Sequence, residues 1–187
     1  IPPNEVIQVA EEFQLAEKLG SWVLNTACEQ LYQWQQLGLV DLQMCVNISP
    51  GMYQRNLLKL VAKALMDHHI PAASLVLEVT EDTTMREVKN SLQLMQDLNQ
   101  QGVQLALDDF GTGYSSLSYL QKLPVSKVKI DRSFIQGIDT SIEASELVAN
   151  ICHMGSMLGK SLVCEGIETQ AQLDVLRTLT DMHLYGQ

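Results

Sequence analysis

The chain alternates between amphipathic helical segments and short apolar runs. Apolar residues recur every three or four positions in six segments, which predicts six helices. Gly20 is expected to end the first segment, Ser21 to cap the second, and Gly38 to end it. Thr84 and Thr169 each begin the pattern of a capping box. The predicted helices cover residues 4–19, 21–38, 57–67, 84–101, 141–158 and 169–176.

Short apolar runs lie between these helices and predict buried strands. They are rich in Val, Ile and Leu, and most lack polar alternation, which is typical of parallel strands covered on both faces. The runs occupy residues 43–48, 75–80, 103–107, 127–130 and 161–164, and a sixth begins near Leu184. The continuous alternation predicts one α/β domain over residues 1–187.

The number of strands bears on how the sheet is arranged. Six strands in a chain that looks cut at both ends favour a TIM-like (β/α)8 barrel, incomplete at both ends here. The pattern alone leaves an open, doubly wound sheet as the alternative.

Polar residues stand where each of these predicted strands ends. They are Asn47, Glu78, Asp108, Asp109, Lys129, Asp131, Glu165 and Gln187. Each alone has an ordinary explanation as a turn former, a helix cap or a member of an ion pair. In a barrel, however, all strands point the same way, so these residues would ring the mouth at which barrel enzymes carry their chemistry. Together they predict a functional site.

The pair Asp108 and Asp109 closes an apolar run and leads directly into a loop rich in glycine and serine. Two carboxylates about 4 Å apart repel by roughly 4 kcal/mol at an effective dielectric near 20. A fold that contains such a pair usually neutralises it with a divalent cation or a shared proton. The backbone N–H groups of loop 111–116 suit a phosphate. The first hypothesis is therefore a metal site that binds a phosphate, with oxygen ligands that select Mg²⁺ or Mn²⁺ over zinc.

Composition narrows the possible partners. The net charge of -10 argues against binding long nucleic acid, which requires a basic surface. No apolar run approaches the ~20 residues that span a bilayer. The four cysteines form no C-x-x-C pair and are expected to be reduced and buried, which favours a cytoplasmic location. Anchoring of a longer parent protein to the inner membrane is left open.

Five motifs then point to a known family. VNIS, LEVTED, DDFGTGYSSLSYL, KIDRSFI and CEGIET, in this order, resemble the EAL domain of bacterial cyclic di-GMP phosphodiesterases. The similarity runs over essentially the whole chain. The resemblance implies a modified TIM barrel that hydrolyses cyclic di-GMP to linear pGpG at a two-metal site holding Mg²⁺ or Mn²⁺.

The resemblance also assigns roles to the metal-binding and catalytic residues. It implies that Asn47 and Glu78 bind the first metal, that Asp108 bridges both metals, and that Asp109 binds the second. Lys129 matches the lysine that contacts the attacking water or phosphate. Glu165 matches the glutamate proposed as general base or water orienter.

Further motif positions match residues around the substrate and the catalytic loop. Glu81 resembles the acid that holds the catalytic loop in place, and Gln187 the glutamine of the family's final Gln-Gly motif. The positions implied to lie in substrate-side and dimer-side segments are Gly111, Thr112, Gly113 and Asp131. The chain departs from the family in having Asp82 where a serine is common, and in lacking the Glu-Ala-Leu signature, which we expect upstream of Ile1.

Partners and rival functions follow from the same resemblance. It implies a homodimer and a parent protein with fused sensor or GGDEF-type domains. The nearest alternative is a catalytically inactive EAL-type receptor for cyclic di-GMP, and the upstream signature glutamate would distinguish the two. A phospho-acceptor signalling domain needs only about five strands and ~120 residues, so the length disfavours it. A structural barrel would leave the carboxylates unexplained.

Overall fold

The computed structural model describes residues 2–54, 56–85, 88–111, 117–179 and 184–186. Contacts within the chain divide it into two compact units, Ile1–Leu105 and Ala106–Gln187. The single domain expected over residues 1–187 stays a prediction. Within the described residues, no helix combines the length and the apolar character needed to cross a bilayer.

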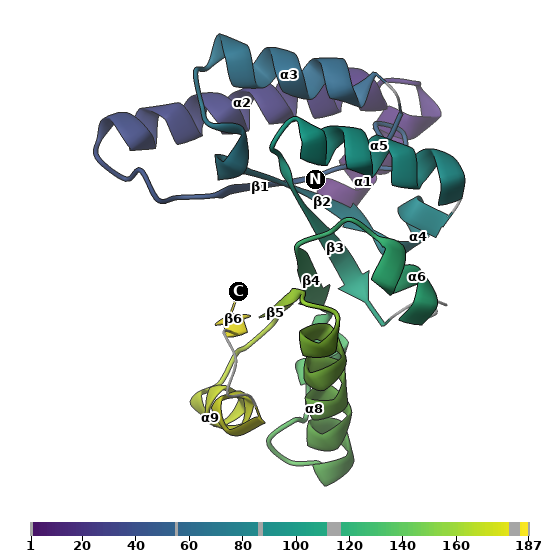
Figure 1. The fold of residues 1–187 in the computed structure, drawn as a ribbon, viewed down its shortest axis with the longest axis vertical. Coiled ribbons are helices and arrows are strands. Elements are labelled where there is room, and N and C mark those ends of the chain that lie inside the picture. Colours follow the sequence, from purple (N-terminus) through teal and green to yellow (C-terminus); the bar gives the residue numbers. More distant parts are fainter. Residues whose placement is uncertain (1, 55, 86–87, 112–116, 180–183, 187) are drawn as a thin grey trace. The chain divides into compact units, whose positions relative to one another are not determined.

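The first unit is built from two paired strands and the helices that cover them. Strand β1 (Met44–Asn47) pairs in parallel with β2 (Leu75–Thr80). Helix α2 packs against β1 and against α3, and Figure 1 shows these two helices lying side by side. The helices are α1 (Pro3–Glu12), α2 (Ala16–Gln36), α3 (Leu57–Asp67), the 3-10 turn η1 (Ala72–Ser74), α4 (Glu81–Met85) and α5 (Val88–Gln100).

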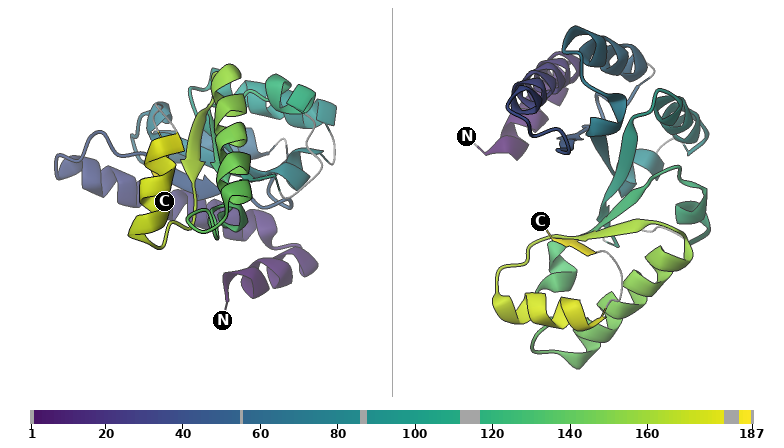
Figure 2. Two further views of the ribbon diagram at one scale, coloured as in Figure 1. Left: turned by 90° about the horizontal axis from the view of Figure 1, so that it is seen from below. Right: turned by 60° about the vertical axis from the view of Figure 1, so that its left-hand side comes forward.

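The second unit contains a run of parallel strands. Strand β3 (Gln104–Phe110) enters it from the first unit and is followed in the sheet by β4 (Lys127–Ile130), β5 (Ser161–Cys164) and β6 (Leu184–Gly186). All three pairings among these strands are parallel. The helices are α6 (Leu117–Lys122), α7 (Arg132–Ile135), α8 (Ile142–Met157) and α9 (Gln170–Leu179). Helix α8 contacts α9 and packs against β5, and Figure 2 shows α8 beside β5. The predicted parallel α/β arrangement is confirmed in each unit.

Side-chain caps begin helices α8 and α9, and the one predicted at Thr169 is confirmed. The hydroxyl of Ser141 accepts a hydrogen bond from the Ala144 N–H at 3.2 Å and caps α8. At α9, the Thr169 hydroxyl accepts from the Gln172 N–H, and the Gln172 side-chain oxygen accepts from the Thr169 N–H, both at 3.1 Å. This reciprocal pair is a capping box, because each side chain satisfies a backbone donor that the helix leaves unpaired.

The predicted boundary between the first two helices is wrong. The helical conformation is interrupted at residues 13–15, where Gln14 adopts a φ of 56°. Helix α2 begins at Ala16 and continues through Gly20. A Cβ at Gly20 would lie 2.1 Å from the sulfur of Met52. Gly20 is therefore a point of close packing inside a helix, and the sequence alone could not separate this role from that of a helix end.

The predicted start of the fourth helix is also wrong. Helix α4 begins at Glu81, and the Thr84 hydroxyl donates to the Glu81 carbonyl at 2.8 Å inside it. The capping partner expected for Thr84, Glu87, lies outside the described residues. The spacing of apolar residues predicted only the longer helix α5. The helices α4, α6 and α7 are too short to show a helical period, so they were not predicted.

One cysteine prediction is wrong. Cys28, Cys152 and Cys164 are buried, but Cys45 is exposed, and none of these four is joined in a disulfide. Side chains alternate along a strand, so Cys45 and Asn47 share one side of β1 while Val46 points to the other. Cys45 and Asn47 are exposed and Val46 is buried, so only one side of β1 is covered within this unit.

Candidate metal centre

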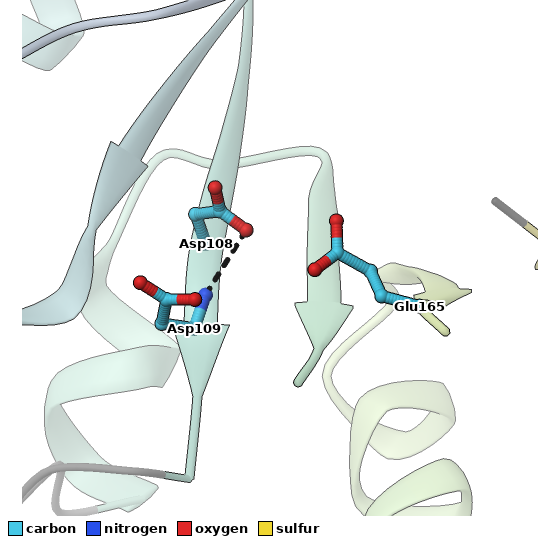
Figure 3. A group of neighbouring side chains, drawn as sticks. All are labelled: Asp108, Asp109 and Glu165. Carbon is cyan, nitrogen blue, oxygen red and sulfur yellow. Dashed lines mark hydrogen bonds between the residues drawn. The ribbon is translucent and has the colours of Figure 1, made fainter. Parts of the chain in front are cut away.

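A local irregularity in β3 brings its two acids together. In a regular strand, Asp108 and Asp109 would point to opposite faces. Here the β3–β4 register shifts between Leu107 and Phe110, and Asp109 has a φ of 54°, in the left-handed region that Asp adopts more readily than most residues. As a result, one carboxylate oxygen from each of Asp108, Asp109 and Glu165 lies within 4.8 Å of the others (Figure 3).

Lys129 forms ion pairs with two of these acids. Its neighbours Val128 and Ile130 are buried core residues of β4, and Lys129 itself is only 5% exposed. Its Nζ lies 3.2 Å from Asp108 Oδ1 and 2.6 Å from Glu165 Oε1. These two ion pairs offset the free energy that burial of an isolated ammonium would cost.

Strand register explains why these groups meet. Ile130 pairs with Cys164 across β4 and β5, so Glu165, the next residue, leaves the sheet beside the end of β4. The Glu165 N–H donates to the Ile130 carbonyl at 3.1 Å and continues the pairing by one residue. The pattern of apolar runs predicted that Asp108, Lys129 and Glu165 stand at corresponding strand ends, and in the second unit Lys129 contacts both acids.

The cluster carries more negative than positive charge. The pKa of Asp109 is raised, first by burial and then by the charges of Asp108, Asp131 and Glu165, while Lys129 opposes the shift. The Asp109 N–H donates to Asp108 Oδ1 at 3.1 Å, which fixes the direction of that carboxylate. Three carboxylates and one ammonium leave an excess of charge that a divalent cation would neutralise, and hard oxygen donors suit such an ion.

Asp131 stands at the edge of this cluster and caps α7. Its carboxylate accepts a hydrogen bond from the Ser133 N–H at 2.9 Å. Hydrogen bonding from Ser133 lowers the pKa of Asp131. Asp131 is therefore a permanent negative charge at neutral pH, close enough to raise the pKa of Asp109.

The first unit contains three further predicted residues, which lie in the last part of its strands or directly after them. Asn47 and Glu78 are opposite each other in the β1–β2 register, with Asn47 exposed and Glu78 5% exposed. Glu81 begins α4 and is 3% exposed, and neither of its carboxylate oxygens has a hydrogen-bond partner in the part of the chain that the structure describes. That Asn47 and Glu78 share ions with Asp108 stays a prediction.

The remaining predicted positions are only partly described. Gly111 follows β3 with a φ of 95°. Thr112, Gly113 and Gln187 lie outside the described residues. A hollow of about 1140 Å³ in the first unit contains none of the predicted site residues and is lined by side chains such as Tyr53 and Asn90.

Sequence reasoning missed two close contacts beside the cluster. A Cβ at Gly111 would lie 2.7 Å from the ring of Phe134, and a Cβ at Gly166 would lie 2.5 Å from Cβ of Arg132. The glycine directly after Glu165 was the available signal, but a sequence does not reveal what a glycine packs against.

Parallel strands that carry a carboxylate cluster and a paired lysine at their carboxyl ends define an α/β domain with a candidate divalent-cation site. A family model described as "EAL domain" matches residues 1–187. The chain belongs to the EAL domain family.

Curated relatives support this assignment. The chain is 39% identical over 187 residues to the bifunctional diguanylate cyclase/cyclic di-GMP phosphodiesterase MucR of Pseudomonas aeruginosa, covering 100% of this chain and 27% of MucR. It is 39% identical over 176 residues to the cyclic di-GMP phosphodiesterase NbdA of the same organism, covering 94% of this chain and 22% of NbdA. The chain thus spans about a quarter of the length of such relatives.

Solved structures give the same result for the fold. A structure described as PaMucR phosphodiesterase in complex with c-di-GMP matches with a TM-score of 0.92 and 39% identity, covering 100% of this chain and 76% of that one. The FimX EAL domain from Pseudomonas aeruginosa bound to c-di-GMP matches with a TM-score of 0.89 and 26% identity, covering 100% and 74%. EAL domains are TIM-like barrels, so the predicted fold class is confirmed.

Proposed function

We propose that this chain is the catalytic domain of a cyclic di-GMP phosphodiesterase that hydrolyses one 3′ phosphodiester linkage and releases linear pGpG. The observation that carries the proposal is the cluster of Asp108, Asp109 and Glu165 around the ammonium of Lys129. The names of MucR and NbdA, both phosphodiesterases of this cyclic dinucleotide, support it.

The donor set fits Mg²⁺ or Mn²⁺. Asp108 would bridge two ions and Asp109 would bind the second, while Asn47 and Glu78 are the proposed ligands of the first. Burial first, and then the neighbouring negative charges, raise the pKa of Asp109, and this crowding of negative charge favours cation binding. When bound, such ions neutralise a phosphate and lower the pKa of a coordinated water.

The protein's own residues then have separate tasks. The Lys129 ammonium contacts Asp108 and Glu165, and its positive charge would offset the negative charge that develops on a phosphate oxygen. The contact with Lys129 orients the Glu165 carboxylate, which positions the attacking water or accepts its proton.

Partners and location are proposed on the same basis. The domain would belong to a longer protein with a sensor or GGDEF-type domain, as the two activities in the name of MucR suggest. We further propose that it works as a homodimer in the cytoplasm.

The test is direct hydrolysis by the full-length parent protein. Incubated with cyclic di-GMP and Mg²⁺ or Mn²⁺, it should release pGpG, detected by chromatography, and EDTA should abolish the product. Glu165→Gln should lose activity, whereas Gln136→Ala, an exposed position at the end of α7, should retain it. Retained binding of cyclic di-GMP without any product would reject catalysis and identify a receptor.

A further inference from the structure

The one-turn helix α7 touches the backbone beside both neighbouring strands. On one side, the ring of Phe134 lies against Gly111, where a Cβ would come within 2.7 Å of Cζ and 2.8 Å of Cε2. On the other side, Arg132 lies against Gly166, where a Cβ would come within 2.5 Å of Cβ and 3.4 Å of Cα. Both glycines have positive φ, 95° and 71°, so a side chain is disfavoured at each for conformational reasons as well.

These two contacts adjoin the carboxylate cluster. Gly111 follows Asp109 by two residues, and Gly166 directly follows Glu165. Strand β4, which carries Lys129, ends at Ile130, and helix α7 begins two residues later at Arg132. Helix α7 therefore contacts the chain at two places, one next to the acids of β3 and one next to Glu165. Lys129 forms ion pairs with acids at both places.

We infer that α7 is a spacer that sets the separation between the β3 carboxylates and Glu165, with Phe134 and Gly166 as positioning residues. Neither residue touches the reacting atoms. The value of this spacing for catalysis rests on the proposed function, but the spacing itself is a property of the folded chain.

The two contacts differ in how easily the opposing atoms could move to make room for a side chain at the glycine. At Gly166 the opposing atoms are the Cα and Cβ of Arg132, which no side-chain rotation can move away. A methyl group there must displace the backbone beside Glu165 and stretch its 2.6 Å contact with Lys129. At Gly111 the opposing atoms are the far edge of the Phe134 ring, which can tilt. Removing the Phe134 ring instead leaves the Gly111 backbone without its support.

The first experiment measures the spacing directly. Crystal structures of the full-length protein should show Lys129 Nζ and Glu165 Oε1 moved beyond hydrogen-bonding distance in Gly166→Ala. The same pair should stay in contact in Gln136→Ala, the matched control directly after α7. An unchanged Lys129–Glu165 contact in Gly166→Ala would overturn the inference.

The second experiment measures cation binding, which depends on the spacing of the acids. Its variants change residues of α7 and keep both glycines. Phe134→Ala should weaken Mn²⁺ binding, measured by titration calorimetry, by about tenfold or more, as is usual when support for ligands is lost. Phe134→Tyr, which keeps the ring, should restore it. Ile135→Val trims a fully buried neighbour that faces the core, and should lower thermal stability without changing Mn²⁺ affinity. Equal Mn²⁺ affinity in Phe134→Ala and Ile135→Val would count against α7 as a spacer.

The two proposals fail separately. If the unaltered protein releases no pGpG but Gly166→Ala still opens the Lys129–Glu165 pair, the phosphodiesterase proposal fails and the spacer stands. If the unaltered protein releases pGpG and both variants keep wild-type geometry and Mn²⁺ affinity, the spacer fails and the phosphodiesterase proposal stands.

Discussion

At the scale of single residues, Lys129 connects the core to the candidate metal centre. From sequence, a lysine between Val128 and Ile130 was equally compatible with a structural ion pair and with a functional role. The structure gives it contacts with Asp108 and Glu165, two residues predicted independently for the site. Its structural role and its proposed catalytic role therefore involve the same two acids.

Replacing this lysine should separate its effects on stability and on catalysis. In Lys129→Met, Asp108 and Glu165 lose the ammonium between them, so the cation-free protein should unfold at a lower temperature. Under the proposed function, kcat should fall by about 10² to 10³, the usual loss for one group that stabilises developing charge. Steady-state kinetics with Mn²⁺ measure this effect.

Lys122→Met is the matched control, because Lys122 is exposed at the end of α6. It should leave both the kinetics and the melting temperature unchanged. Wild-type turnover in Lys129→Met would exclude the role given to the ammonium.

At the scale of elements, Gly20 shows why a glycine can mislead a sequence prediction. In an uncrowded helix, Gly→Ala stabilises by about 1 kcal/mol. At Gly20 the added methyl group would meet the Met52 sulfur, so Gly20→Ala should instead lower the free energy of unfolding by about 1 to 3 kcal/mol. Denaturant unfolding provides the measurement.

A double variant tests the cause of that loss. Adding Gly20→Ala to Met52→Ala should cost little, or should stabilise, because the opposing sulfur is gone. A similar loss in both backgrounds would show that Met52 is not the reason for glycine at this position.

The cap of α7 makes stability depend on pH. Because the Ser133 hydrogen bond lowers the pKa of Asp131, its ionised form stabilises the fold. This contribution is present above the carboxyl's unfolded pKa and is lost as the pH falls through its lower folded value. Asp131→Ala should cost about 1 kcal/mol near pH 7, as for other N-caps, and the difference from wild type should shrink in acid.

Asp131→Asn separates the cap from the charge. It keeps an acceptor for the Ser133 N–H but removes the same negative charge, so it should be more stable than Asp131→Ala. Thermal melts of the three proteins across acidic and neutral pH provide the comparison. Equal stability of the Asn and Ala variants would mean that the hydrogen bond contributes nothing.

At the scale of the whole molecule, the sequence predicted the class of fold better than the local geometry. Apolar runs between periodic segments predicted parallel strands, and residues 75–80, 127–130 and 161–164 match β2, β4 and β5 in full. Asp108, Lys129 and Glu165 were predictable because parallel strands end at one edge. The left-handed turn at Asp109 and the Gly166–Arg132 contact were not, since both depend on distances that a pattern of residue types does not contain.

Binding of divalent ions should be visible in the stability of the full-length protein. A ligand that binds only the folded state at 100 times its Kd stabilises by about 2.7 kcal/mol. Mn²⁺ should therefore raise the melting temperature of the wild type relative to EDTA, and Asp109→Asn should reduce this response. A melting temperature indifferent to Mn²⁺ would contradict the metal centre.

The lysine that bridges Asp108 and Glu165 is part of the chain, so the protein itself supplies some of the positive charge that its clustered carboxylates require. A cation that binds beside Lys129 therefore meets a smaller net negative charge than the same carboxylates would present alone, and the electrostatic part of its affinity is correspondingly smaller.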